Sequence, residues 1–358
     1  MVKRLKLLAM DIGSGTQDIL LYDSEKNIEN CIKMVLPTPS QIFASKVREA
    51  TRLFQNLFIK GDTIGGGAFA SALLKHIKNG LRVFMTEDAA YTVRNNLDEV
   101  KQLGIEIVTQ PPEAFQGRTL ILEEVNLTTL ESILAPFGEK LNVDAVAVAV
   151  QDHGVSPKGT SNRQNRIQKM QEFLKKDAYL ENLAFTGDKV PADFLRMKSA
   201  VQAANRQMPR TEIVIMDTSP AAMLGCLQDP DVEKAHQVMA VNVGNGHTMA
   251  AIVKDGRILA VMEHHTSLLN AEKLEHLLSD FTKGRLSDKD VFDDGGHGLF
   301  YLQRPAGLSE LEKIAVTGPK RSLLAQTSLP IHFAAPAGDM MMTGCVGLIE
   351  VTKRKLSL

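Results

Sequence analysis

Short apolar runs alternate with helical patterns along the chain, which favours a mixed α/β fold over an all-α or all-β one. Residues 7–10 and 19–22 flank a glycine-bearing turn and predict an antiparallel hairpin. Residues 32–36 would add a third strand before two prolines stop it. Ser40 is then expected to cap a helix that reaches Phe54.

The middle of the chain continues the alternation. Apolar segments at 57–64, 82–85 and 105–108 predict strands with helices between them. Residues 143–150 are almost entirely Ala and Val, which is typical of a strand buried on both faces. Residues 156–180 are polar and predict an exposed loop that leads into a helix.

The opening layout recurs about 230 positions later. Residues 238–243 and 249–253 flank a second glycine turn, and 258–262 follow as a third strand after a tight turn. The repeat predicts two related lobes, each beginning with the same supersecondary unit.

The first glycine turn carries candidate chemistry. Gly13 and Gly15 allow a tight bend that brings backbone N–H groups close to an anion, and Ser14 and Thr16 add hydroxyl donors. Asp11, at the end of the first strand, would hold a hydrated Mg²⁺. The alternative is a hairpin turn with polar residues facing solvent.

The second turn has glycines at the same offsets, with Asn242 in the place of Asp11. Two facing glycine turns can hold a polyphosphate from both sides, which one turn cannot. The residues expected to contact phosphate here are Gly244, Asn245, Gly246 and Thr248.

Three further segments have local signatures. Ser219 and Pro220 begin a helix with small residues up to Gly225, and a second helix near the C-terminus carries Gly344 and Gly347. The two could cross closely and form a hinge between lobes, or simply pack tightly. A strand at 314–317 ends in a glycine turn that could accept adenine and ribose, through Gly318, Lys320 and Ser322.

These five segments, in this order, resemble the superfamily of acetate and sugar kinases, heat-shock chaperone ATPases and actin. The matching stretches are residues 7–22, 217–225, 238–253, 314–323 and 336–350. The resemblance implies an α/β, two-lobed actin-like ATPase (ribonuclease H-like) fold, with duplicated βββαβα units and a central cleft that holds ATP and Mg²⁺. The expected lobes are residues 1–232 and 233–337, with a helix at 338–352 packing back on the first.

More narrowly, the chain is similar to a prokaryotic family labelled pyruvate formate-lyase activating enzyme-like. Such activases are radical enzymes that need a C-x-x-x-C-x-x-C cluster motif, and Cys31, Cys226 and Cys345 cannot supply one. Two residues depart from the superfamily pattern. Asn242 replaces a usual second aspartate, and Pro319 replaces a frequent glycine and removes an N–H donor. Both departures leave catalytic competence open.

A competing motif lies at Gly65 to Gly67, which fits G-x-G-x-x-A between a strand and a helix. Glu87 follows about 20 residues on, where a dinucleotide site needs an acid for the ribose. The segment is either an NAD-type site or a turn at the cleft that receives substrate.

Acids and histidines near predicted strand ends complete the candidates. Asp152 follows the most buried strand and is the preferred general base, with His153 as the alternative, although either could simply cap the next element. His264 and His265 are neighbours on a strand and cannot both bind one ion. A substrate pocket involving the histidines and acids around 293–297, including His297, stays conceivable.

Composition narrows the classes. The formal net charge is −1, from 41 Lys and Arg against 42 Asp and Glu, so neither nucleic acid nor an acidic membrane is an expected partner. Three widely spaced cysteines favour a reducing compartment. The apolar stretch after the basic start meets Asp11 too soon for a secretory signal, so we expect a cytoplasmic location.

Three functions fit these observations. The first is Mg-ATP-dependent phosphoryl transfer to a small hydroxyl or carboxyl metabolite, and the second is a nucleotide-switched ATPase that acts on a protein partner. The third is an NAD(P)-binding enzyme that uses the turn at Gly65 and Gly67. The sequence leaves the oligomeric state undefined.

Overall fold

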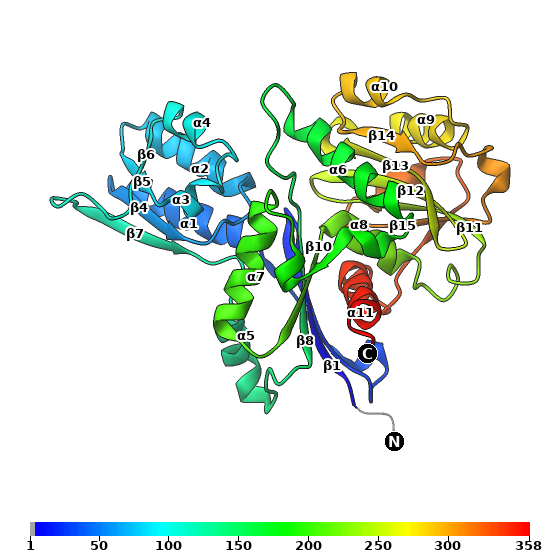
Figure 1. Ribbon diagram of the computed structural model, residues 1–358, viewed down its shortest axis with the longest axis horizontal. Helices are drawn as coiled ribbons and strands as arrows, with labels where there is room; N and C mark the ends of the chain where they lie inside the picture. Colours follow the sequence, from blue (N-terminus) through cyan, green and yellow to red (C-terminus); the bar gives the residue numbers. More distant parts are fainter. Residues whose placement is uncertain (1–3) are drawn as a thin grey trace.

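Three β-sheets organise the chain, and two of them are built to the same plan (Figure 1). The computed structural model describes residues 4–358; residues 1–3, part of the basic start, lie outside it. Within the described residues no helix is long and apolar enough to cross a membrane.

The first sheet has the strand order β3-β2-β1-β8-β10-β9. Its strands are β1 (Lys6–Ile12), β2 (Thr16–Asp23), β3 (Ile32–Pro37), β8 (Ala145–Val150), β9 (Ala184–Thr186) and β10 (Glu212–Met216). The first three form an antiparallel meander, whereas β8 runs parallel to β1 and β10 parallel to β8. The expected hairpin and third strand are therefore confirmed. All six residues of β8 are buried, because strands flank it on both sides and helices cover both faces.

The second sheet has the order β14-β13-β12-β11-β15-β16. Its strands are β11 (Gln237–Val243), β12 (His247–Lys254), β13 (Arg257–His265), β14 (Gly298–Tyr301), β15 (Lys313–Thr317) and β16 (Ile331–Phe333). Again three strands form an antiparallel meander, followed by two strands parallel to the first of them. The predicted repeat is confirmed in order and direction for five strands of each sheet; β9 and β14, each antiparallel to its neighbour at a sheet edge, have no counterpart in the other sheet. The boundary expected at 232/233 falls in the connection that enters β11.

A third sheet projects from the first lobe, on the left of Figure 1. It contains β4 (Asn56–Gly61), β5 (Val83–Met85), β6 (Ile105–Ile107) and β7 (Gly117–Leu122), all parallel. It packs its own core with the helices α1 (Pro39–Arg52), α2 (Gly67–Lys78), α3 (Glu87–Ala90) and α4 (Leu97–Gln102). The strands at 57–64, 82–85 and 105–108 were expected, but their periodicity carries no information about which sheet they join.

The start of α1 differs from the expectation. Its N-cap is Thr38, whose hydroxyl accepts from the Gln41 N–H at 3.3 Å, with Pro39 at the first helical position. The predicted cap Ser40 instead accepts from the Phe69 N–H and donates to the Gly66 carbonyl. Ser40 thus fixes the beginning of α2 beside α1.

The remaining helices cover the two similar sheets. They are α5 (Leu127–Leu134), α6 (Asn162–Lys176), α7 (Leu195–Gln207), α8 (Thr218–Cys226), α9 (Ala271–Thr282), α10 (Asp288–Asp293) and α11 (Thr343–Leu356). The polar segment that was expected to lead from a loop into a helix becomes α6, capped by Ser161. One face of α6 is buried, which its polar composition did not indicate.

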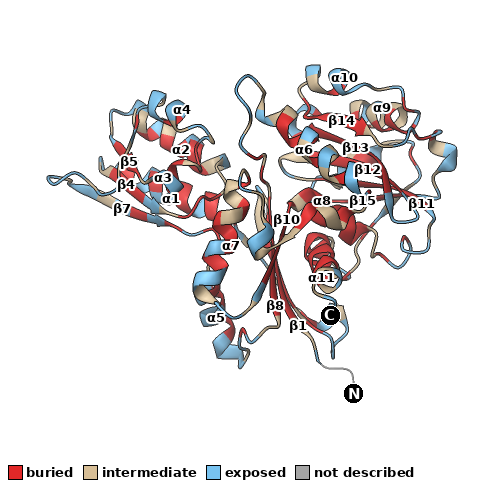
Figure 2. Cartoon of the chain, viewed as in Figure 1, coloured by how far each residue is buried: buried red, intermediate tan, exposed pale blue. Residues whose placement is uncertain are grey.

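The two small-residue helices, α8 and α11, cross between the lobes, where Figure 2 shows both largely buried. A methyl group on Gly225 would overlap the Thr343 carbonyl, and one on Gly347 would overlap the Ala221 carbonyl. The helices therefore meet backbone to backbone. Thr343 also donates a hydroxyl hydrogen bond to the Met340 carbonyl at the start of α11. The hinge role of this crossing stays a prediction.

We expect Gly347→Ala to lower the free energy of unfolding by about 1–3 kcal/mol, because the added methyl group must push two buried helices apart. The matched control is Gly67→Ala, whose methyl group would meet only the Ser40 hydroxyl, at 3.7 Å. The control should change stability by less than about 1 kcal/mol. Urea denaturation of both variants measures the difference, and equal losses would contradict the close crossing.

Candidate functional site

A cavity of about 510 Å³ lies between the two similar sheets, and all five matched segments reach it. The first turn and α8 contribute Asp11, Gly13, Ser14, Gly15, Thr16, Thr218, Ser219 and Ala222. The later segments contribute Asn242, Gly244, Asn245, Gly246, His247, Thr317, Gly318, Pro319, Met340, Met341, Thr343 and Gly344. Segments more than 300 residues apart in sequence thus share one wall.

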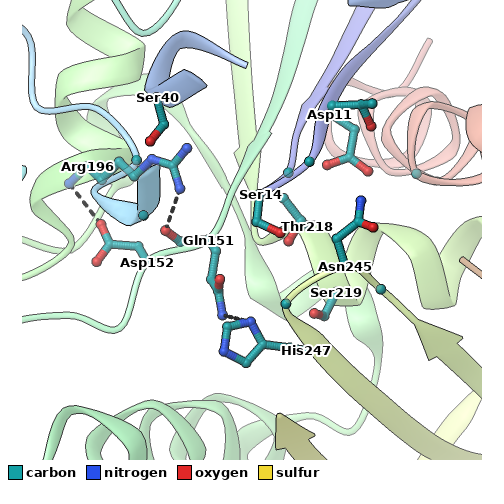
Figure 3. Close-up of a pocket in the computed structure, with 18 of the residues that line it drawn as sticks. Asp11, Ser14, Ser40, Gln151, Asp152, Arg196, Thr218, Ser219, Asn245 and His247 are labelled. Carbon is teal, nitrogen blue, oxygen red and sulfur yellow. Dashed lines mark hydrogen bonds between the residues drawn. The ribbon is translucent and has the colours of Figure 1, made fainter. Parts of the chain in front are cut away.

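The two glycine turns have the same local geometry and face each other. The Gly13 N–H donates to the Thr16 carbonyl at 3.0 Å, and the Gly244 N–H donates to the His247 carbonyl at 2.9 Å. A methyl group on Gly15 would strike the Asn245 amide, and one on Gly246 would lie 3.2 Å from the Ser14 hydroxyl. Figure 3 shows Ser14 and Asn245 reaching into the same space.

Two carboxylates lie beside the first turn, and one oxygen of each lacks a hydrogen-bond partner. Asp11 and Asp18 are directly paired across β1 and β2. The Oδ1 atom of each is buried and has no hydrogen-bond partner among residues 4–358. Burial raises the pKa of Asp11 well above its usual value, with Asp18 and Asp217 adding repulsion. Burial likewise raises the pKa of Asp18 to about 7, against a hydrogen bond from Thr16. Uncompensated buried carboxylates of this kind suit a divalent cation.

The expected adenosine segment is only partly at the cavity. Gly318, at φ 97°, packs against the second turn, where a side chain would strike the Val243 carbonyl. Lys320 holds the turn through its backbone N–H to the same carbonyl, but neither Lys320 nor Ser322 lines the cavity. Thr248 does not line it either; its buried hydroxyl lies 3.0 Å from that of Thr266.

Asp152 lines the cavity beyond the end of β8. Its Oδ1 accepts from the Gly154 N–H, and its Oδ2 accepts from the N–H groups of Arg196 and Met197. The carboxylate therefore positions the start of α7, as Figure 3 shows. Burial raises its pKa to about 6, against these hydrogen bonds. Its role as a general base stays a prediction.

The glycine turn at 65–67 opens onto the same cavity, where Arg94 and Arg196 also lie. The Gly65 N–H donates to Glu124, a buried carboxylate that also pairs with Arg196. The strands on either side of α2 are parallel, as a dinucleotide motif requires. Glu87, however, is exposed, accepts from the Tyr91 hydroxyl and does not line the cavity. The turn at 65–67 thus opens onto the same cavity as the two other glycine turns, and Glu87 does not supply the acid that a ribose would need.

A buried ion cluster, which the sequence analysis missed, joins the lobes behind the cavity. Arg166 of α6 binds both oxygens of Asp217 at the start of α8 and both oxygens of Glu263 on β13. The side chains of Arg166 and Glu263 are 1% and 0% exposed. Arginine in a polar helix gave no indication of this role.

Four histidines gather next to that cluster. His153, His247, His265 and His297 lie with neighbouring ring centroids 4.7 to 5.4 Å apart. His264 points away and bonds Asp294, so the prediction that His264 and His265 cannot share an ion agrees with their placement. Proximity of His153 to His297 had no sequence signature, because 144 positions separate them.

The duplicated sheets with their shared cleft define the actin-like ATPase fold, and the expected fold class is confirmed. The chain belongs to the family described as “Putative pyruvate format-lyase activating enzyme (DUF1786)”, whose model matches residues 64–323, more than two thirds of the chain. The family resemblance suggested by the sequence is thereby confirmed as well. No curated protein matches the sequence.

Several solved structures are similar in outline. A Bacteroides thetaiotaomicron protein described as having an actin-like ATPase fold is 10% identical, with 95% of each chain covered and a TM-score of 0.37. A Listeria monocytogenes protein described as “a putative N-acetylmannosamine kinase” is 10% identical, with 98% of this chain and 100% of that chain covered and a TM-score of 0.38. Ethanolamine utilization protein EutJ from Carboxydothermus hydrogenoformans is 11% identical, with 97% and 89% covered and a TM-score of 0.32. At these TM-scores, the assignment of the fold rests on the strand topology of this chain.

The iron–sulfur cluster that the family's description implies does not fit these cysteines. Cys31, Cys226 and Cys345 are free, buried and far apart in sequence. Burial raises the pKa of the Cys226 and Cys345 thiols, which disfavours the thiolates that iron requires. These three cysteines therefore do not support the radical chemistry of such an activase.

Asp18→Asn should remove the pH-dependent free-energy cost of burying an ionised carboxylate. Folding raises the pKa of Asp18 from its ordinary value of 3.8 to about 7. The free energy of unfolding therefore falls as the pH rises from the pKa of the unfolded chain to that of the native state. Between about pH 5 and about pH 8 we expect the variant to gain roughly 2–3 kcal/mol relative to the unchanged protein. Urea titrations at both pH values measure it; the exposed Asp98→Asn is the control. A gain independent of pH would contradict the assignment.

Proposed function

We propose that the cavity binds Mg-ATP between the two glycine turns and that the protein transfers the terminal phosphoryl group to a small hydroxyl or carboxyl metabolite. One observation carries the proposal: the two turns, α8, the turn at Gly318 and the start of α11 meet around a single cavity. Backbone N–H groups of both turns would hold a polyphosphate from opposite sides.

Asp11 and Asp18 are the residues that would hold Mg²⁺. Their orphaned Oδ1 atoms and raised pKa values support this assignment, because a cation would supply the missing partner. When bound, the ion would neutralise phosphate charge as it develops during transfer. Asn242 offers an amide where the first turn offers Asp11, so the cation belongs to the side of the first turn.

The acceptor would lie at the end of the cavity formed by the turn at 65–67. Arg94 and Arg196 line that end, and Arg196 is already balanced by Glu124. Arg94 donates to the Val93 carbonyl and has no ion-pair partner in residues 4–358. Its charge favours an anionic acceptor, such as a small carboxylate. Asp152 lies nearby and would accept the proton of an acceptor hydroxyl, while the phosphate turns bind the donor.

Mg-ATP at 100 times its dissociation constant should stabilise the protein by about 2.7 kcal/mol. Asp11→Asn should abolish the part of this gain that depends on Mg²⁺, because the amide cannot balance the cation. Thermal shifts with ATP in the presence of Mg²⁺ or of a chelator measure it.

Asp98→Asn, which changes an exposed carboxylate outside the cavity, is the matched control and should respond like the unchanged protein. Full Mg²⁺-dependent stabilisation in the Asp11 variant would rule out the proposed cation site. Stabilisation by NAD⁺ instead of Mg-ATP would favour a dinucleotide site at residues 65–67.

The rate of acceptor-dependent ATP turnover should fall as the pH drops through about 6, because Asp152 must be ionised to accept a proton and burial raises its pKa to that value. Asp152→Asn should lose this acidic limb together with at least about 100-fold in kcat. A screen of small carboxylates and alcohols with ADP detection measures the rate. Mg-ATP binding without any acceptor-dependent turnover would favour a nucleotide-switched protein that acts on a protein partner.

A further inference from the structure

Three imidazole rings from separate parts of the chain converge on the wall of the cavity. His153 follows β8, His247 begins β12 and His297 precedes β14. One nitrogen of each lies within 4.8 Å of the others. The Nε2 atoms of His153 and His297 are 3.2 Å apart, close to the roughly 3.3 Å that separates two nitrogens on one tetrahedral zinc ion.

One buried polar atom of the same cluster lacks a hydrogen-bond partner. His297 is 0% exposed, and its Nδ1 has no hydrogen-bond partner among the described residues. The nearest carboxylate oxygen, Glu263 Oε2, lies 3.8 Å from that Nδ1. A small inward movement of the ring would bring this pair to hydrogen-bonding distance and leave Nε2 free to bind a metal.

The buried charges behind the rings are also unbalanced. Arg166 carries one positive charge against the two carboxylates of Asp217 and Glu263, and all three side chains are at most 6% exposed. With neutral imidazoles the group has one excess negative charge in a medium where charge is costly. A cation next to Glu263 would offset it.

We propose that His153, His247 and His297 bind one divalent transition-metal ion, with zinc the best match, and that its fourth coordination position opens into the cavity. Glu263 is the outer carboxylate that orients His297. His153 and His247 line the cavity, whereas His297, which is fully buried, and His265 do not. The ion would therefore take an oxygen ligand from the cavity: a water molecule, or a carboxylate or hydroxyl of a bound metabolite.

The donor chemistry supports a transition metal over Mg²⁺, because neutral imidazoles select zinc-like ions and Mg²⁺ prefers oxygen. Burial lowers the pKa values of His153 and His247 to about 4 and that of His297 to about 2. Burial thus favours the neutral imidazole, which is the form that binds metal ions.

Gln151 would complete the outer contacts. Its side-chain amide nitrogen, Nε2, lies 3.0 Å from His247 Nδ1, and Figure 3 shows the pair at the edge of the cavity. With the amide oxygen turned toward that nitrogen, His247 would donate from Nδ1 and bind metal through Nε2. The first turn has Thr16 at the corresponding offset, so only the second turn offers a nitrogen ligand.

The test titrates chelator-treated, nucleotide-free full-length protein with Co²⁺ and then Zn²⁺. We expect one ion per chain, a visible absorption spectrum typical of tetrahedral Co²⁺, and displacement of Co²⁺ by Zn²⁺. His153→Gln and His247→Gln should each lower the affinity for Zn²⁺ by more than about 100-fold, because loss of a direct ligand exceeds the usual cost of losing an outer one.

His236→Gln is the matched control. This exposed histidine pairs with Asp255 outside the cavity, so its loss should leave metal binding unchanged. Circular dichroism of each variant verifies folding. Absence of saturable Co²⁺ or Zn²⁺ binding, or equal affinities in all variants, would overturn the proposal. Because the measurement contains no nucleotide, its failure leaves the Mg-ATP result unaffected, and a failure of Mg-ATP binding leaves the metal result unaffected.

Discussion

The contact on which the arrangement of the lobes depends most is that of Arg166 with Asp217 and Glu263. It joins α6 and the N-cap of α8 to β13, with every partner buried. Asp217 also caps α8 and accepts from the Asp152 N–H, and Glu263 lies behind His297. Removing one partner from such a cluster typically costs about 3–5 kcal/mol, because a bare charge stays buried. The Arg166 guanidinium therefore holds α6, α8 and β13 together and, in Asp217 and Glu263, contacts the residues that support Asp152 and His297.

The crossing of α8 and α11 constrains the lobes at a second point. Gly225 and Gly347 allow backbone contact there, and α11 also packs on β1. The Cys345 thiol donates to the carbonyl of Asp18, so α11 is fixed directly behind the paired carboxylates. The contacts of Arg166 and the crossing of α8 and α11 therefore connect the two similar sheets at two separate places.

Sequence predicted what is local and repeated. The two hairpins, the apolar β8 and the matching offsets of Gly13 and Gly244 follow from periodicity and turn chemistry, whereas the particular fold was implied by the resemblance of five segments to a known superfamily. Contacts between residues far apart in the sequence could not be predicted from these local patterns. Nothing in the pattern separates β4–β7 from the first sheet, and nothing brings His153 to His297. The cap at Thr38 was missed because Ser40 looks equally suitable until the position of Pro39 is weighed.

The duplicated turns have diverged in chemistry while keeping their backbone. Counting from the matched glycines, Asp11 corresponds to Asn242 and Asp18 to Met249, so the second lobe has lost both carboxylates. By the same count Thr16 corresponds to His247, so the second turn carries a nitrogen donor where the first carries a hydroxyl. Under the two proposals, the oxygen donors beside the first turn would suit a hard cation, and the nitrogen donors beside the second turn would suit a softer one. The two sites would then lie on opposite sides of one cleft.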